Sequence, residues 1–310
     1  MISELLTLQV LLGVLSSGIR LATPYLYAAI GETFGQRSGV LNLGVDGMML
    51  MGAFSGFYVA LNTENLWLGL GAAVLVGGVM GLAMAFISVT LQAEQGISGI
   101  GVYLFGLGLS DLLFQRLIGT AKTVKGFPEL PIPGLSQIPY LGEIFFNHNV
   151  LVYGAYLLVP ISWFILNKTT MGLKIRAVGE NPESADSLGV NVAAVRYATV
   201  TLGGVLSGVA GASLSIALLN VFQQNLTNGL GFIAVALVYF GGWRPVYVLA
   251  GSLIFSLVNA LQVWVQVLGI PIPSDVAVMM PYLLTIVVLV LTAQRVRQPS
   301  ALTKPYERGG

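Results

Sequence analysis

The chain has 310 residues, of which 55% are hydrophobic and only 9% are charged, and its mean hydropathy is +0.84. Soluble domains carry about a quarter charged residues, so this composition predicts a polytopic membrane protein. The net charge of +1 argues against a nucleic-acid partner, and the absence of cysteine excludes disulfides, a thiol nucleophile and a sulfur-ligated metal.

The sequence also lacks the residues of an enzyme. His148 is the only histidine, so no histidine cluster can form, and neither a catalytic triad nor a metal-ligand set is recognisable. No G-x-x-x-x-G-K-[ST] phosphate loop occurs, so the chain cannot hydrolyse ATP by that route. We therefore expect no catalytic, cofactor-binding or metal-binding residues.

Apolar runs long enough to cross about 30 Å of hydrocarbon recur along the whole chain. We predict an all-α fold with about nine transmembrane helices, some interrupted or re-entrant, in a single transmembrane domain of residues 1–310. Glycines such as Gly77 and Gly81, or Gly204 and Gly208, favour close helix packing. The predicted spans are 6–30, 40–61, 67–91, 97–118, 150–167, 197–219, 230–243, 246–269 and 276–293.

Positive charges predict the orientation of these spans. The loop 168–196 and the tail 294–310 each carry four Lys or Arg residues, so the positive-inside rule places both in the cytoplasm. The four spans predicted between them are the even number that this placement requires. Counting back along the chain places the loop 121–149 and the N-terminus outside.

Two ionisable residues fall inside the first two predicted spans. Arg20 and Asp46 each cost at least about 2.5 kcal/mol at mid-membrane, so each needs a partner. Both lie on polar helix faces, and a pair between neighbouring helices is geometrically possible. Such a pair either holds two helices in register or lines a substrate route, and the use of polar pairs between membrane helices favours the first interpretation.

The segment 94–110 opens a predicted span with Gly96, Gly99 and Gly101. These glycines would leave the first backbone amides of the helix free to face a pathway. Flexible packing glycines are the alternative interpretation. The weak glycine-rich matches to nucleotide fingerprints in this span and in 203–211 are better explained by helix packing.

The loop 168–196 is a polar island in an apolar sequence. Asn181 can cap a helix, Pro182 suits its first position and Gly189 suits its end, so a short exposed helix over about 182–188 is predicted. In a membrane protein, such a helix is typical of a docking site for a soluble partner. An ordinary solvated loop is the alternative.

A second irregular segment, 220–228, is rich in amides and precedes a short apolar run that ends at Gly241 and Gly242. Non-helical backbone at membrane depth is tolerated only where it lines a cavity or is buried in protein. Interrupted helices in both halves indicate a substrate route in transporters. The candidate pathway residues are Asn42, Asp46, Gln95, Ser98, Tyr103, Asn220, Phe222, Gln223, Asn225 and Phe232.

Four blocks carry a resemblance that covers nearly the whole chain, and they are residues 20–54, 94–110, 172–192 and 229–255. The chain resembles the membrane permease subunits of bacterial ABC importers in the branched-chain amino acid and simple-sugar superfamily, most closely the nucleoside permeases. The resemblance implies a multi-pass subunit of the bacterial plasma (inner) membrane, in contact with lipid. It also implies three partners: cytoplasmic ABC ATPases, a homologous second permease in a heterodimer, and an extracytoplasmic substrate-binding lipoprotein.

The resemblance further identifies the polar island as the coupling loop. The residues that would then fit the ATPase groove are Gly179, Glu180, Asn181, Pro182, Glu183, Ala185 and Gly189. The expected function is ATP-driven import of nucleosides by alternating access, with ATP hydrolysed in a separate subunit. A permease for a simple sugar or another small neutral solute, and a self-contained secondary transporter, are the alternatives.

One position departs from the pattern of the family. Relatives often have a polar amide where this chain has Tyr103, a ring with a hydroxyl that can stack on another ring and bond a sugar. The segment 220–228 offers amides without charge, which suits a neutral polar solute better than an amino-acid zwitterion.

Overall fold

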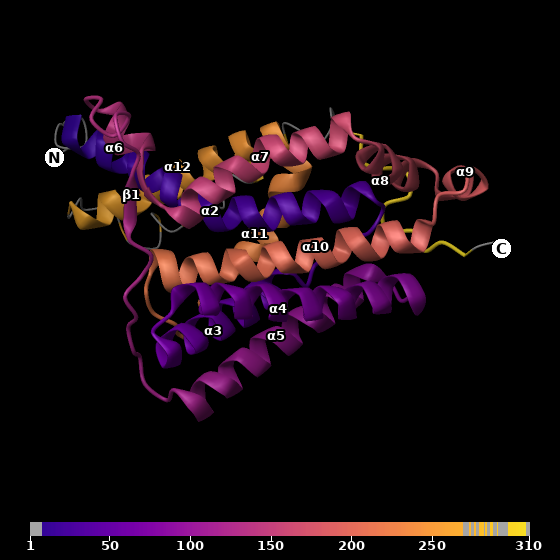
Figure 1. Ribbon diagram of the computed structural model, residues 1–310, viewed down its shortest axis with the longest axis horizontal. Coiled ribbons are helices and arrows are strands. Elements are labelled where there is room, and N and C mark those ends of the chain that lie inside the picture. Colours follow the sequence, from indigo (N-terminus) through magenta and orange to yellow (C-terminus); the bar gives the residue numbers. More distant parts are fainter. Residues whose placement is uncertain are drawn as a thin grey trace.

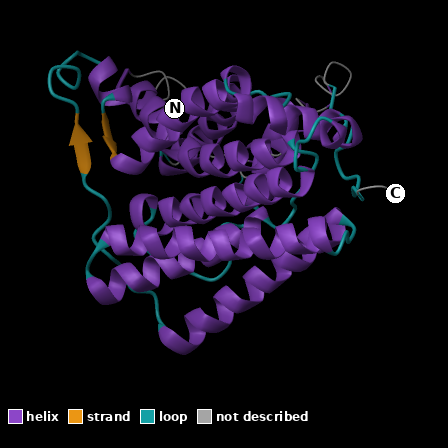
Figure 2. Ribbon diagram, turned by 45° about the vertical axis from the view of Figure 1, so that its right-hand side comes forward, coloured by secondary structure: helices purple, strands orange, loops and turns teal. Residues whose placement is uncertain are grey.

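The described part of the protein is nearly all helix, with one short pair of strands (Figure 2). This computed structural model describes residues 8–268 and 297–307, together with a few separate positions between 273 and 290. The helices are α2 Leu8–Arg37, α3 Val45–Thr63, α4 Leu66–Ala85, α5 Gln95–Leu117, α6 Leu141–Phe145, α7 Val150–Lys168, α8 Thr170–Glu180, α9 Pro182–Ser187, α10 Val192–Ser213, α11 Leu230–Phe240 and α12 Pro245–Val267. The π-helical turns Phe86–Thr90 and Leu214–Leu218 extend α4 and α10, and β1 Glu129–Pro131 pairs antiparallel with β2 Asn147–Asn149.

Six of the described helices are long and apolar enough to cross a membrane, which confirms the all-α membrane class. They are α2, α4 with its π-helical turn, α5, α7, α10 with its π-helical turn, and α12. The predicted span 230–243 corresponds to the short apolar helix α11, and most of the predicted span 276–293 lies outside the described residues. The predicted number of nine spans therefore stays a prediction.

The limits of the first two predicted spans are wrong. Helix α2 continues to Arg37 instead of ending near residue 30, and α3 begins at Val45 instead of residue 40. The polar residues Glu32 and Gln36 resemble a loop in the sequence, but the Gln36 side chain donates to the Glu32 carboxylate one helical turn away (3.1 Å). This pairing satisfies both groups inside the helix, so the loop is displaced to 38–44.

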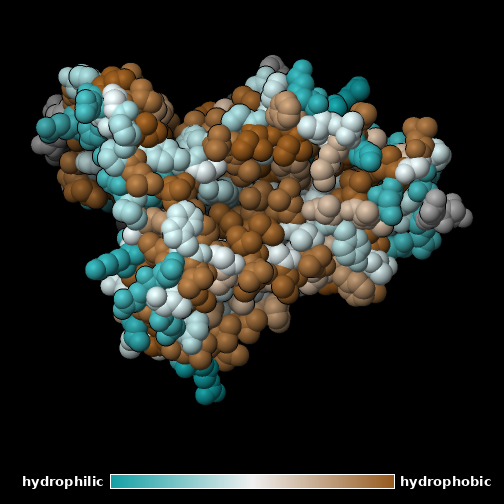
Figure 3. Space-filling model, viewed as in Figure 1, coloured by the Kyte–Doolittle hydropathy of each residue, from teal (hydrophilic) through white to brown (hydrophobic). Residues whose placement is uncertain are grey.

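Two polar ends enclose an apolar belt. Helices α8 and α9 and the C-terminus lie at one end of the molecule, whereas the N-terminus, α6 and β1 lie at the other (Figure 1). Hydrophobic side chains cover the surface between the two ends, where the long helices run (Figure 3). We refer to these ends as the α9 end and the β1 end.

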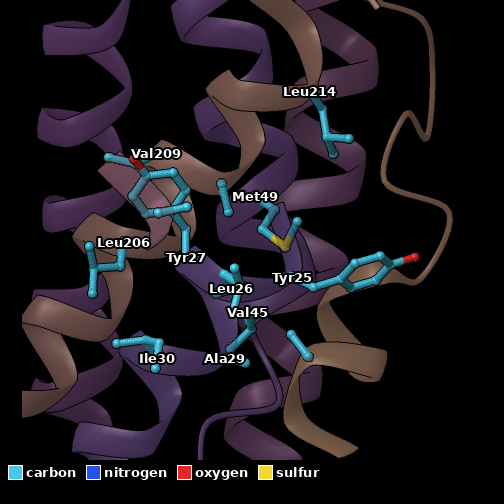
Figure 4. Close-up of a cluster of buried hydrophobic side chains, with 14 of the residues drawn as sticks. Tyr25, Leu26, Tyr27, Ala29, Ile30, Val45, Met49, Leu206, Val209 and Leu214 are labelled. Atoms are coloured by element: carbon cyan, nitrogen blue, oxygen red, sulfur yellow. The ribbon is translucent and has the colours of Figure 1, made fainter. Parts of the chain in front are cut away.

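Helix α10 is the centre of the bundle, because 72% of the residues in its apolar stretch are buried. In α5, only 17% of the apolar stretch is buried. In the core, Leu26 and Ile30 of α2 lie close to Met49 of α3 and to Leu206 and Val209 of α10 (Figure 4). The low burial of α5 matches its oblique position at the edge of the bundle (Figure 1).

The predicted close approach of glycines is confirmed between α4 and α10. A Cβ atom at Gly204 would lie 2.5 Å from the Cα atom of Gly81 and would also collide with the carbonyl oxygen of Gly77. A Cβ atom at Gly208 would lie 3.1 Å from the Cα atom of Gly77. Small residues at this crossing therefore allow the two backbones to touch.

Candidate functional site

Two non-helical segments of the bundle meet at Asp46. One is the α2–α3 connection, 38–44, and the other is the α10–α11 connection, 219–229. Asp46 is fully buried near the start of α3, and its carboxylate accepts hydrogen bonds from the Thr227 hydroxyl (2.9 Å) and the Gly231 backbone N–H (2.7 Å). Because Gly231 lies in the first turn of α11, the carboxylate satisfies an otherwise free amide and faces the positive end of the helix.

The hypothesised Arg20–Asp46 pair is not present in the described structure. Thr227 and Gly231 occupy the two oxygens of Asp46, whereas the buried Nε of Arg20 has no hydrogen-bond partner among the described residues. Arg20 instead lies within electrostatic reach of His148, which is in β2. The predicted helical face with Asn42 and Asp46 does not form, because Asn42 lies before the start of α3, and the sequence did not reveal that α11 begins beside Asp46.

The predicted opening at the start of α5 is wrong. The Glu94 carboxylate accepts hydrogen bonds from the backbone N–H groups of Gly96 (3.0 Å) and Ile97, so the first amides of the helix are capped. These two bonds hold the pKa of Glu94 below its ordinary value, because they stabilise the charged form. The bond from Ile97 has the larger effect. Ser98 donates to the Glu94 carbonyl (2.6 Å), and α5 is continuous from Gln95 to Leu117.

The start of α5 is nevertheless attached to the α2–α3 connection. The Gln95 side chain is buried and accepts a hydrogen bond from the Leu41 backbone N–H (2.8 Å). A Cβ atom at Gly99 would lie 2.6 Å from the Leu43 backbone nitrogen, so Gly99 is a packing glycine. In the same connection, Asn42 is buried and its side chain accepts from the Gly44 N–H (2.8 Å). Gln95 and Asn42 therefore support the non-helical backbone beside Asp46.

The amide-rich segment 219–229 is genuinely non-helical. Asn220, Asn225 and Asn228 adopt positive φ values of 57°, 51° and 42°, in the left-handed region that Asn tolerates better than most residues. The Asn225 backbone N–H donates to the Asp111 carboxylate of α5 (3.4 Å). This segment therefore interrupts the chain between α10 and α11, as the sequence predicted.

The side chains of this segment divide into anchors and exposed groups. Phe222 is fully buried and packs edge-on against Phe54 (ring centroids 5.5 Å apart), so it is a core anchor. Gln223 and Asn225 are exposed. Tyr103 of α5 contacts Phe232 of α11 edge-on (ring centroids 5.0 Å apart), and these two rings join α5 to α11.

The predicted helix in the polar island is present as α9. The Asn181 side chain accepts from the Ser184 backbone N–H (2.9 Å), and Pro182 is the first helical residue. Gly189 ends the turn with φ +83°, which favours glycine. Helix α9 ends at Ser187, one residue before the predicted end, so the local signals were sufficient to place it.

The predicted coupling residues lie in or beside α8 and α9, and they divide into a buried pair and a more exposed group. Ala185 is buried in a small cluster with Val178 and Val192, and Gly179 is buried against the backbone of Arg37. Glu180, Asn181, Glu183 and Gly189 are exposed, and Pro182 is half-buried. The buried pair attaches α9 to the bundle, and the exposed group is the part that can meet a partner.

The C-terminal tail packs against this same end. The sequence predicted that the tail and the loop 168–196 lie on one side of the membrane, but it did not indicate this packing. The Ala301 N–H donates to the Gly179 carbonyl (2.9 Å), and the Thr303 N–H donates to the Gly39 carbonyl (3.2 Å). The guanidinium of Arg196, in α10, donates to the Lys304 carbonyl (3.1 Å). Residues 301–304 therefore connect α8, the α2–α3 connection and α10.

A truncation tests whether the tail holds α8 and α9 in place. Removing residues 298–310 is expected to increase amide hydrogen exchange over 172–190, because the hydrogen bonds between the tail and the bundle are lost, including those to Gly179 and Glu180 of α8, and the exposed segment can open locally. The matched control is Lys304→Ala, which leaves exchange unchanged because the contact is made by the backbone carbonyl. Equal exchange in the truncated and full chains would show that the tail has no such role.

A buried polar network, also missed in the sequence, connects the last turns of α2 to the α2–α3 connection and to the turn between α11 and α12. The Glu32 carboxylate is buried and accepts from the Gln36 side chain (3.1 Å) and the Asn42 backbone N–H (2.9 Å). Gln36 in turn accepts from the Trp243 indole (2.7 Å), in the turn between α11 and α12. The spacing of Glu32 and Gln36, four residues apart after an apolar run, is the signal that could have revealed it.

The architecture defines a class of protein. Six apolar helices span the belt, two non-helical segments meet between them, and an ordered helix projects at one polar end. Irregular backbone inside a bundle and an exposed helix at its end are typical of membrane transport subunits. The molecule is accordingly a multi-pass permease-type membrane protein.

The chain belongs to the family described as "Branched-chain amino acid transport system / permease component", whose family model matches residues 14–289. The resemblance inferred from the sequence is therefore confirmed. Membership of this family and the six apolar helices make the chain a multi-pass protein of the plasma membrane. No solved structure matches the chain significantly.

Curated relatives cover almost the full length of the chain. A putative glucose ABC transporter permease protein of Haloferax volcanii is 40% identical over 96% of this chain and 98% of its own. A guanosine ABC transporter permease protein of Bacillus subtilis is 35% identical over 97% of this chain and 98% of its own. A nucleoside ABC transporter permease protein of Lactococcus lactis is 36% identical over 90% of this chain and 92% of its own. Each of these two bacteria also has a second, more distant matching permease. The relatives are transport components, not enzymes.

Proposed function

We propose that this permease subunit forms the translocation pathway for nucleosides in an ATP-driven importer. Two relatives with 35% and 36% identity are named for guanosine and nucleoside transport. The exposed amides of 219–229, such as Gln223 and Asn225, offer donors and acceptors without charge. That chemistry suits a neutral solute with hydroxyls and base edges.

Helix α9 is the proposed contact with the ATPase subunits. It is short, capped by Asn181 and attached to the bundle through Ala185, while Glu183 and Leu188 are exposed. A movement of α9 can pass to α2 through Gly179, which lies against the Arg37 backbone. ATP binding and hydrolysis then switch the bundle between outward-facing and inward-facing states.

The proposed assembly contains three further components. Two ABC ATPases dock at the α9 end, which then lies in the cytoplasm, and a substrate-binding lipoprotein docks at the β1 end. A homologous second permease completes the pathway as a heterodimer. The second matching permease in Bacillus subtilis and in Lactococcus lactis supports this pairing.

A sugar is the second candidate substrate. The relative with 40% identity is named as a putative glucose permease. Amides bind sugar hydroxyls as well as base edges, so the chemistry of the 219–229 segment suits both solutes.

Uptake into proteoliposomes tests the function. The complete transporter, reconstituted with its ATPases, second permease and binding protein, is expected to accumulate labelled guanosine or uridine only with hydrolysable ATP. Accumulation of glucose but of neither nucleoside would assign the sugar instead. Uptake that persists without ATP would identify a self-contained secondary transporter and overturn the ATP-driven mechanism.

A further inference from the structure

A cavity of about 330 Å³ lies between α2, the 219–229 segment, α11, α12 and Pro281. This volume falls at the lower end of the range of small-molecule sites. Its polar and aromatic lining consists of Tyr25, Thr227, Asn228, Phe255, Asn259 and Gln262. None of the described residues around it is charged.

Two amides of α12 distinguish this cavity from a packing defect. Asn259 and Gln262 are three residues apart and therefore lie on one face of a mostly apolar membrane helix. Neither side chain forms a hydrogen bond within the part of the chain that the structure describes. Polar side chains inside a membrane helix face the protein interior or a water-filled cavity and mark functional positions. Both amides line this cavity and leave donors and acceptors available to an occupant.

Two aromatic residues form another part of the lining, the aromatic wall. Tyr25 of α2 and Phe255 of α12 are buried and pack edge to face, with ring centroids 5.2 Å apart at 74°. An aromatic wall favours a ring-shaped or apolar face of a ligand. The cavity therefore combines an apolar side with an uncharged hydrogen-bonding side.

The cavity is also attached to the break in the bundle. Thr227 lines it and donates its hydroxyl to Asp46, so the carboxylate fixes part of the wall. The next residue, Asn228, lies in the left-handed region with φ 42° and is exposed. A movement of α11 relative to α3 would therefore change the shape of the cavity.

We propose that this cavity is a solute-binding site within the permease, and that it takes a neutral solute with a flat ring and several hydrogen-bonding groups. The inference rests on the proposed function, and it locates substrate recognition on α2 and α12. Asn259 and Gln262 bond the hydroxyls or base edge of the solute, and the ring packs on the aromatic wall. The described part of the lining is uncharged, which disfavours a zwitterion, because a zwitterion would lose its hydration without a partner there.

The absence of cysteine from the chain allows a direct test. In the complete transporter, Asn259→Cys and Gln262→Cys are each expected to react with a methanethiosulfonate ethylammonium reagent. Saturating guanosine, uridine or glucose should slow that reaction roughly fivefold or more if the solute fills the cavity. The matched control is Leu261→Cys, because Leu261 is 38% exposed and lies on a different face of α12. Its reaction should not respond to solute.

A kinetic readout separates this site from a structural role. Asn259→Leu and Gln262→Leu are expected to raise the KM for uptake by roughly threefold to tenfold each, the range for one lost hydrogen bond. The control Leu261→Cys, at a position outside the lining, should keep the KM and the solute-free ATPase activity of the wild type.

The outcomes distinguish the two proposals. If the wild type transports nucleosides but no probe slows labelling, or if neither cysteine reacts, the cavity is not the binding site and the proposed function stands. If only glucose protects and only glucose is transported, the nucleoside assignment fails and the cavity stands. An unchanged KM in both leucine variants overturns the role of the amides.

Discussion

Substitution of two exposed side chains in the α9 segment, Glu183→Arg with Leu188→Asp, is expected to reduce uptake at least roughly tenfold and to release the ATPase subunits. Leu188 is 85% exposed and Glu183 is also exposed, so neither contributes to the core of this subunit. An exposed leucine beside a charged group at a capped helix is typical of an interface residue that a partner buries. Purification of the tagged permease, with quantification of the ATPases that remain bound, measures the effect.

The matched control is Leu135→Asp, which makes the same change at an exposed leucine in the segment between α5 and α7. This variant should retain its ATPases, because the segment lies toward the β1 end of the molecule (Figure 1). Both variants should reach normal membrane levels. Retention of the ATPases and of uptake by the α9 variant would show that α9 is not the docking site.

Gly189→Trp is a weaker test of the docking site, because the backbone φ of +83° at this position strains any residue other than glycine.

The features that the sequence predicted well are those determined by neighbouring residues. Helix α9 follows from the Asn181 cap, Pro182 and Gly189, which act within one turn of the chain. The close packing of Gly77 with Gly204 was also predictable, because small residues at helical spacing have few other uses in apolar spans. The membrane class followed from composition alone.

The features that the sequence did not reveal depend on contacts between distant segments. Asp46 was recognised as needing a partner, but its partners Thr227 and Gly231 lie more than 180 residues away in sequence. Glu32 is stabilised by Gln36 in the same helix and by Asn42 after it, so its polar surroundings resembled a loop. The packing of the tail through the backbone of Ala301 left no signal, because backbone hydrogen bonds do not depend on residue type.

Asp46 is expected to be the most sensitive single position of the bundle. Asp46→Leu leaves the Thr227 hydroxyl and the Gly231 N–H without an acceptor in a fully buried place. Each buried donor that loses its acceptor destabilises the fold by about 1–3 kcal/mol, and this substitution leaves two donors without an acceptor. We therefore expect this variant to lose uptake and to unfold at a lower temperature in detergent.

Asp46→Asn distinguishes hydrogen bonding from charge at this position. Its amide oxygen can accept from the Gly231 N–H, and its amide nitrogen can donate to the Thr227 hydroxyl oxygen, so both contacts are kept without charge. We expect Asp46→Asn to keep most of its thermal stability and uptake. Thr227→Val removes one contact, so its stability and uptake should fall between those of Asp46→Leu and Asp46→Asn. If Asp46→Leu transported like the wild type, the break between α3 and α11 would not depend on this carboxylate. If Asp46→Asn failed as completely as Asp46→Leu, the negative charge at the start of α11 would be the essential feature, because the hydrogen bonds alone would then be insufficient.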